Sequence, residues 1–95
     1  MSFMWSEDQR FAPAPDVVTR VLDGEAVVLD LAAERYFGLN SVGTRIWELA
    51  SAGKTFAEIR AAIVDEFDVD AEAAGRDVGE LLTTLAEKQL IRQLP

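Results

Sequence analysis

The sequence VVTRVLDGEAVVLDL spans residues 17–31 and holds two β-branched runs joined by Asp23 and Gly24. Valine and threonine favour extended strands. A two-residue hairpin turn requires positive φ at both central positions, and the pair aspartate-glycine adopts this conformation readily. This stretch therefore predicts a β-hairpin.

A third short run, RYFGL, occupies residues 35–39 and follows the connection AAE. It extends the hairpin to a three-stranded antiparallel meander. Because side chains alternate along a strand, we expect Phe37 to share one face with Leu39, and Tyr36 to share the other with Gly38. The outer strand of such a sheet has unpaired backbone groups, to which an extended peptide can add.

Beyond the strands the apolar period changes from two to about three and a half, which indicates helices. The first helix is expected to begin after Asn40 or Ser41 and to end near Gly53. Thr55 and Glu58 have the spacing of a capping box, which predicts the start of a second helix.

Asp70 is the expected N-cap of a third helix that runs to about Leu90. Three strands followed by three helices predict an α+β domain of the winged helix-turn-helix type, with a three-stranded antiparallel sheet. We expect residues 16–95 to form this domain. Residues 1–15 include two prolines one residue apart and are expected to be a flexible N-terminal segment.

The 95 residues include neither cysteine nor histidine, which excludes thiol chemistry, imidazole catalysis and ordinary zinc sites. We therefore expect no enzymatic activity. Seventeen acidic and nine basic residues give a net charge of −8, which repels nucleic acid and anionic membranes and favours a cationic partner. No apolar run approaches the ~20 residues of a membrane span, so a cytoplasmic protein is expected.

An acidic run, DEFDVDAE, occupies residues 65–72 and raises the question of a calcium site. Counted from Asp65, the sixth and twelfth positions of an EF-hand loop would be Asp70 and Arg76, where glycine and glutamate are required. The run is therefore interpreted as a solvated turn between helices. The glycines do not form a phosphate-binding motif, and no metal or cofactor is predicted.

A winged-helix DNA-binding regulator is the alternative from another class of function, and a module that dimerises through its sheet edge is a third. A recognition helix for DNA should present arginine and lysine to the bases. The third helix is net negative, with the charged residues Glu72, Arg76, Asp77, Glu80, Glu87 and Lys88. Its charge disfavours a duplex as the ligand.

The chain resembles the PqqD-like family of peptide-modification chaperones over about residues 16–92. The resemblance lies in GEAVVLDLAAERYFGLNSVGTRIWELASAGKT from Gly24 and in EIRAAIVDEFDVDAEAAGRDVGELLTTLAEKQLI from Glu58. Proteins of this family are RiPP recognition elements, which bind the leader segment of a ribosomally made precursor peptide and present it to modifying enzymes. Their fold is the same winged helix-turn-helix.

In this family the leader docks as an added antiparallel strand on the third strand, facing the third helix. The resemblance therefore implies a paired edge at Arg35, Tyr36, Phe37 and Gly38. At 100° per residue, one flank of the third helix carries Asp77, Leu81, Thr84 and Lys88, and the other carries Gly75, Gly79 and Leu82. We prefer the first flank as the wall of the peptide site.

Within this flank, Leu81 is expected to form the floor of a pocket, Asp77 to meet a basic leader residue and Lys88 an acidic one. The alternatives are that Leu81 belongs to the ordinary core and that Tyr36 packs against Trp47. The chain most resembles the stand-alone leader-binding partner of the lasso-peptide maturation protease. The alternative within the family is the precursor chaperone of pyrroloquinoline quinone synthesis, which serves a radical enzyme.

Overall fold

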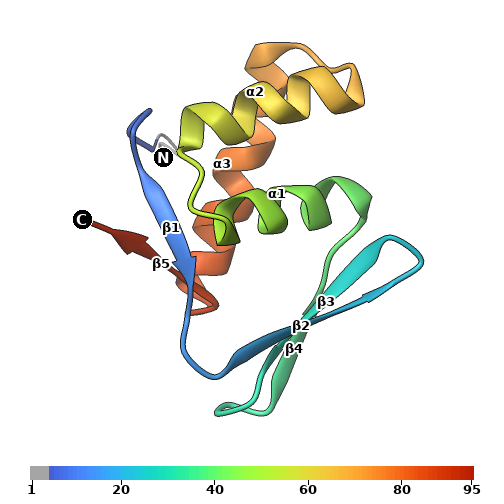
Figure 1. Cartoon of the computed structure of the whole chain (residues 1–95), viewed down its shortest axis with the longest axis vertical. Helices are drawn as coiled ribbons and strands as arrows, with labels where there is room; N and C mark the ends of the chain where they lie inside the picture. Colours follow the sequence, from blue (N-terminus) through green and yellow to red (C-terminus); the bar gives the residue numbers. More distant parts are fainter. Residues whose placement is uncertain (1–4) are drawn as a thin grey trace.

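The computed structural model describes residues 5–95, which form five strands and three helices (Figure 1). In chain order they are β1 (Arg10–Pro13), β2 (Val17–Leu22), β3 (Glu25–Asp30), β4 (Arg35–Gly38), α1 (Ser41–Ser51), α2 (Phe56–Phe67), α3 (Ala71–Glu87) and β5 (Ile91–Leu94). The predicted α+β fold is confirmed, with the meander β2-β3-β4 preceding the three helices.

The predicted hairpin is confirmed in its position and in its turn. β2 and β3 pair antiparallel, and Leu22 lies opposite Glu25 at the closed end. Asp23 has φ 54° and Gly24 has φ 79°, so both central residues are in the positive region that the turn requires. β4 pairs antiparallel with the other side of β3.

The three helices begin where the capping signals predict. The side chain of Asn40 accepts from the amide of Gly43 at the start of α1. Thr55 and Glu58 form the complete capping box of α2, and the Asp70 side chain accepts from the amide of Ala73 at the start of α3. Each cap satisfies amides that have no partner within the helix.

The end of α3 differs from the prediction, because the helix stops at Glu87 rather than near Leu90. Gln89 adopts a left-handed conformation with φ 61°, which turns the chain out of the helix. The residues that follow form β5 instead, a short strand that the apolar periodicity did not predict.

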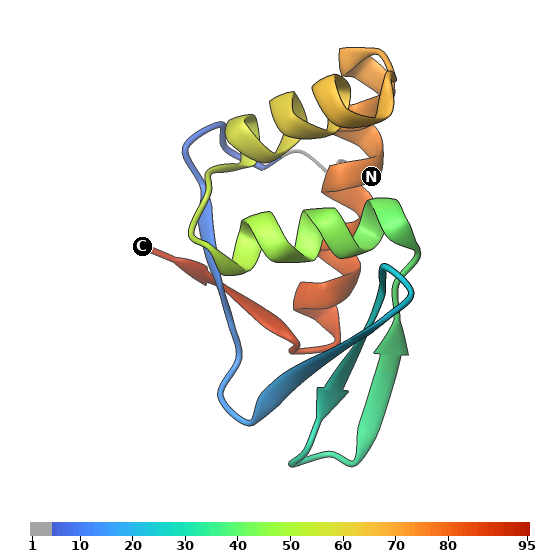
Figure 2. The ribbon, with the colours of Figure 1, turned by 45° about the vertical axis from the view of Figure 1, so that its right-hand side comes forward.

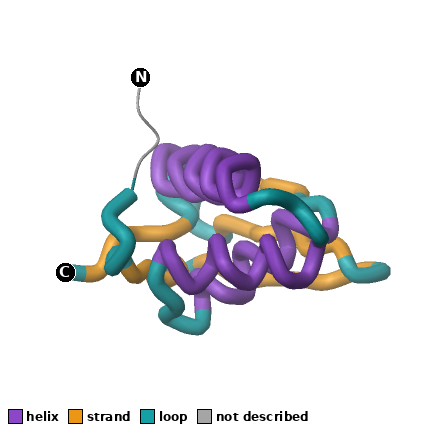
Figure 3. The backbone as a smooth tube through the Cα atoms, turned by 90° about the horizontal axis from the view of Figure 1, so that it is seen from above, coloured by secondary structure: helices purple, strands orange, loops and turns teal. Residues whose placement is uncertain are grey.

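The structure also corrects the expectation that residues 1–15 are a flexible segment ahead of the fold. Arg10–Pro13 form β1 and pair antiparallel with β5, with Phe11 opposite Gln93. Phe11 is 1% exposed and packs edge-on against Trp5, with 5.2 Å between ring centroids. The first described residues and the C-terminal residues therefore lie on the same side of the molecule, at the left of Figure 3. Residues 1–4 lie outside the described part.

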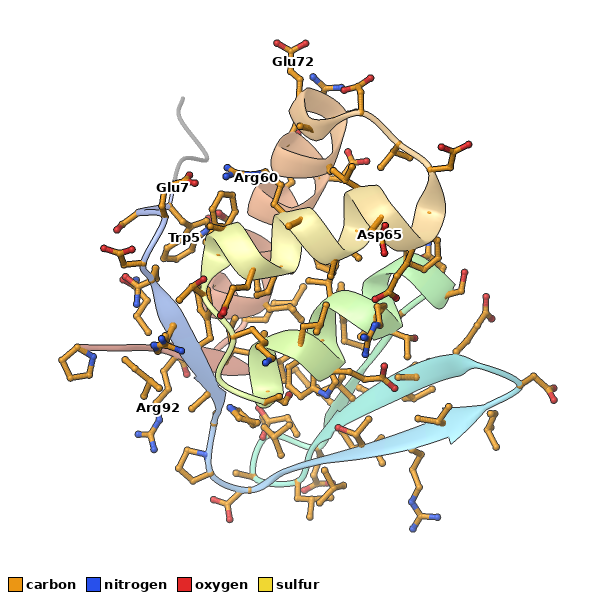
Figure 4. All side chains as sticks on the ribbon, turned by 45° about the horizontal axis from the view of Figure 1, so that its top comes forward. Trp5, Glu7, Arg60, Asp65, Glu72 and Arg92 are labelled. Carbon is orange, nitrogen blue, oxygen red and sulfur yellow. The ribbon has the colours of Figure 1, made fainter. Side chains whose placement is uncertain are left out.

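The segment before β1 caps helix α2. The amides of Phe56 and Ala57 donate to the carbonyls of Gln9 and Glu7, at 2.9 and 3.1 Å. The carboxylate of Glu7 accepts from the guanidinium of Arg60, as Figure 4 shows. This hydrogen bond holds the pKa of Glu7 below its usual range.

The helices form a layer over one face of the sheet. In Figure 2, α1 lies between α2 and the sheet, and α3 crosses behind both. The large side chains with less than 2% exposure come from β1, β3 and all three helices: Phe11, Val28, Ile46, Ile59, Ile63, Val78, Leu82 and Leu85.

Two side-chain hydrogen bonds fasten α1 to the sheet. The buried hydroxyl of Thr44 accepts from the amide of Ala26 at 2.7 Å. The indole of Trp47 donates to the hydroxyl of Thr19 at 2.9 Å. Together they fix the first turns of α1 against the inner face of the sheet, next to the end of β4.

The Thr44 bond leads to a testable expectation. Thr44→Val keeps the shape of the side chain but leaves the amide of Ala26 buried without an acceptor, which should lower the free energy of unfolding by about 1–3 kcal/mol. Thr44→Ser retains the hydroxyl and is the matched control. Urea denaturation followed by circular dichroism measures both, and equal stability of the two variants would contradict the assigned bond.

Candidate functional site

The sheet of β2, β3 and β4 has an open edge at β4, with which no strand of residues 5–95 pairs on its outer side. The amide of Leu39 donates to the carbonyl of Ala26 at 2.8 Å, so the backbone groups of Leu39 face β3. Because these directions alternate along a strand, the amides and carbonyls of Tyr36 and Gly38 face away from β3. They form a short row of donors and acceptors.

A hollow of about 370 Å³ lies beside the end of β4. It is lined by the end of β4, the start of α1 and two residues of α3: Phe37, Gly38, Leu39, Asn40, Val42, Gly43, Ile46, Asp77 and Leu81. Most of this wall is apolar, and Asp77 is the one charged side chain in it. The hollow can therefore receive an apolar side chain with a basic group near its rim.

A second, smaller hollow of about 50 Å³ lies at the other end of β4 and is lined by Arg35, Tyr36, Phe37, Lys88 and Leu90. The ammonium of Lys88 lies 5.6 Å from the centroid of the Phe37 ring, a cation–π contact. The guanidinium of Arg35 donates to the carbonyl of Lys88 at 3.4 Å. Two cations thus border this end of the edge.

Seven of the eight predicted site residues line these hollows, and α3 turns the preferred flank toward β4. Thr84 is the exception, since it lines neither hollow. On the opposite flank Gly79 and Leu82 are buried in the core, and a Cβ at Gly75 would lie 3.3 Å from the side chain of Arg60. A role of the seven residues in peptide binding stays a prediction.

Tyr36 points to the outer face of the sheet, where it lies in one row with Leu29 and Val18. Its side chain is 77% exposed, whereas Trp47 is buried on the inner face. The alternative that Tyr36 packs against Trp47 is therefore wrong. Its position leaves the backbone of Tyr36, rather than its ring, facing the open edge.

Sequence reasoning missed the contribution of α1 to the larger hollow. Asn40, Val42, Gly43 and Ile46 line it together with β4 and α3. Gly43 allows the close approach, because a Cβ there would lie 3.2 Å from the side chain of Leu39. The cap at Asn40 was a signal for this placement, since it sets the direction in which α1 leaves β4.

The acidic side chains of the run at residues 65–72 form an ion pair, cap a helix or lie exposed to solvent. Arg45 donates to both carboxylate oxygens of Glu66, at 2.8 and 3.0 Å, and Asp70 caps α3. Asp65 and Glu72 project outward (Figure 4). Within residues 5–95 no three acidic side chains are grouped to hold a metal ion, and no helix is long and apolar enough to cross a membrane.

The three-stranded meander followed by three helices defines a winged helix-turn-helix domain, whose sheet has an open edge at β4 within residues 5–95. The family model described as "Coenzyme PQQ synthesis protein D (PqqD)" matches residues 25–91. The chain belongs to this family. The "PqqA binding protein" of Xanthomonas campestris pv. campestris (strain B100) is 37% identical over 62 residues, 65% of this chain and 67% of that protein.

Two solved structures have the same fold. "TbiB1 in Complex with the TbiA(beta) Leader Peptide" is 41% identical, with a TM-score of 0.80 over 85% of this chain and 94% of that one. "Lasso peptide synthetase B1 complexed with the leader peptide" is 27% identical, with a TM-score of 0.79 over 90% of this chain and 99% of that one. Each of these proteins is held in a complex with a leader peptide.

Proposed function

We propose that this chain binds the leader segment of a ribosomally made precursor peptide and presents it to a partner enzyme, the leader protease of a lasso-peptide system. The observation that carries the proposal is the open edge of β4 beside two hollows, in a chain 41% identical to TbiB1. All the predicted site residues lie between Arg35 and Lys88. We place its action in the cytoplasm, where precursor peptides are made.

In this function the leader adds to β4 as an antiparallel strand. Tyr36 and Gly38 offer backbone groups to about two residues of leader, so backbone pairing supplies only part of the affinity. The larger hollow, with Leu81 in its wall, supplies the remainder by taking up an apolar side chain. This division of roles explains why a short edge suffices for specific binding.

The second candidate is a chaperone for the precursor of pyrroloquinoline quinone. It is favoured by the family match and by the 37% identity to the PqqA binding protein, over a shorter share of the chain than the match to TbiB1. A titration with both kinds of leader separates the two. Tighter binding of a PQQ precursor than of a lasso leader would favour the second candidate.

Hydrogen exchange tests where the leader binds. With a lasso-peptide leader added, amide protection should rise at residues 35–39 and 77–88, because these segments border the bound strand. Residues 55–65 of α2 serve as the internal control and should not change. Protection concentrated on α2 or on residues 5–15 would contradict strand addition at β4.

We propose further that the chain has no catalytic activity. Its 95 residues provide neither the thiol of a cysteine protease nor the imidazole of a Ser-His-Asp protease, and the proposal assigns the proteolytic step to the partner enzyme. Purified chain mixed with the intact precursor should leave it uncut over hours, as mass spectrometry would show. The precursor with added partner protease is the positive control. Cleavage by the purified chain alone, at a rate proportional to its concentration, would refute this proposal.

A further inference from the structure

The two hollows beside β4 carry opposite charges. In the larger hollow the one charged wall residue is Asp77, whereas the smaller hollow is bordered by Arg35 and Lys88. Arg35 is partly engaged, since its guanidinium lies 3.9 Å from Asp30 and donates to the carbonyl of Lys88. The ammonium of Lys88 makes the cation–π contact with the ring of Phe37.

The acidic residues near the two hollows do not cancel the difference in charge between them. Glu34 and Glu87 adjoin the two cations in sequence, but neither lines the smaller hollow. At the other end, Glu80 lies one turn from Asp77 and is exposed, so it adds to the negative charge there. The edge of β4 therefore runs from a positive end at Arg35 to a negative end at Gly38.

The topology fixes the order in which a bound strand meets these charges. α3 runs opposite to β4, because Lys88 lies beside the start of β4 and Asp77 beside its end. All strand pairs of this sheet are antiparallel, and an added strand that continues the pattern runs opposite to β4 as well. The leader then passes Asp77 first and Lys88 later.

Helix geometry gives the distance between the two charges. Lys88 follows Asp77 by eleven positions, which corresponds to about 16 Å at 1.5 Å per residue. An extended peptide covers this length with about five residues, at roughly 3.3 Å each. Both charges can therefore be met by one short segment of leader.

We propose that this groove selects leaders by charge order: a lysine or arginine comes first, and an aspartate or glutamate follows about five residues later, with apolar residues between them. The inference rests on the proposed function and specifies its substrate class. Charge order distinguishes a leader from a peptide of the same composition with the reversed sequence. It therefore sets both the register and the direction of the bound strand.

A displayed library of random dodecapeptides tests the proposal without knowledge of the natural precursor. Peptides selected on the wild-type chain should be enriched in basic-then-acidic pairs about five residues apart, by roughly two- to fivefold for each charge, the effect typical of partly exposed ion pairs. The double variant Asp77→Lys/Lys88→Glu has the same net charge. Its selected peptides should show the opposite order.

The control variant is Asp65→Lys/Lys54→Glu, which exchanges two charges away from the groove and should select the wild-type order. Selected peptides must also lose binding to Gly38→Pro, which removes an amide from the open edge. Peptides that depend on Gly38 but show no charge order, or an order that does not reverse, would overturn this inference alone. Peptides insensitive to Gly38→Pro, or no bound peptides, would overturn the proposed function with it.

Discussion

Gly38→Pro should raise the Kd for the leader by roughly 5- to 150-fold while the domain stays folded. The amide of Gly38 faces the open edge, so its loss breaks no bond to β3, and proline is tolerated at such edge positions. In the complex, however, a leader carbonyl is buried without its donor, which costs about 1–3 kcal/mol. Fluorescence anisotropy with labelled leader measures the change.

Gly38→Ala is the matched control for this prediction. A Cβ at this position meets no atom within 4 Å, and alanine keeps the amide. The alanine variant should bind within about threefold of the wild type. If alanine and proline weaken binding equally, the edge amide of Gly38 does not pair with the leader, and the mode of binding is wrong.

Phe11→Ala should lower the free energy of unfolding by about 3–5 kcal/mol, the range for a fully buried phenylalanine. Small domains have about 5–15 kcal/mol in total, so this single change removes a large share. Thermal and urea unfolding measure it. Leu22→Ala is the control, since Leu22 is 70% exposed and should change stability by less than about 0.5 kcal/mol.

A small effect of Phe11→Ala would mean that the segment before β2 is not part of the folded unit. That outcome would restore the interpretation of residues 1–15 as a flexible N-terminal segment. The ion pair of Glu7 with Arg60 cannot replace the aromatic contact, because the Glu7 side chain is 59% exposed and ion pairs open to solvent contribute little.

The elements that were predicted from sequence all have local signals. The turn at Asp23 and Gly24, the capping box at Thr55 and the cap at Asp70 depend on residues within four positions of each other. Hydrogen bonds between residues close in sequence stabilise the turn and the two helix caps, so a short stretch of sequence is enough to predict them.

The pairing of β1 with β5 has no such signal. Pro13 lies opposite Ile91, and the attraction between two segments so far apart depends on the completed core. The nearby prolines predict an extended segment outside the fold, whereas proline is compatible with a short strand paired on one side only. Tertiary packing, not local preference, makes this strand.

The site was predictable in the same uneven way. The helical period of 100° identified the flank of α3 that carries Asp77 and Leu81, and the strand pattern identified the edge at residues 35–38. The share of α1 in the larger hollow depends on how Val42 and Ile46 approach β4 in space. The spacing of residues along the chain does not predict how closely α1 approaches β4.

The pairing of residues 10–13 with residues 91–94 also has a consequence for synthesis. Ribosomes add about 5–20 residues per second, so the 78 residues from Ala14 to Ile91 take roughly 4–16 s to make. Throughout this interval β1 has no partner strand, and the aromatic side chain of Phe11 lacks its final cover. The nascent chain therefore presents an apolar segment to the cell for seconds, until almost the last residue of the fold has been added.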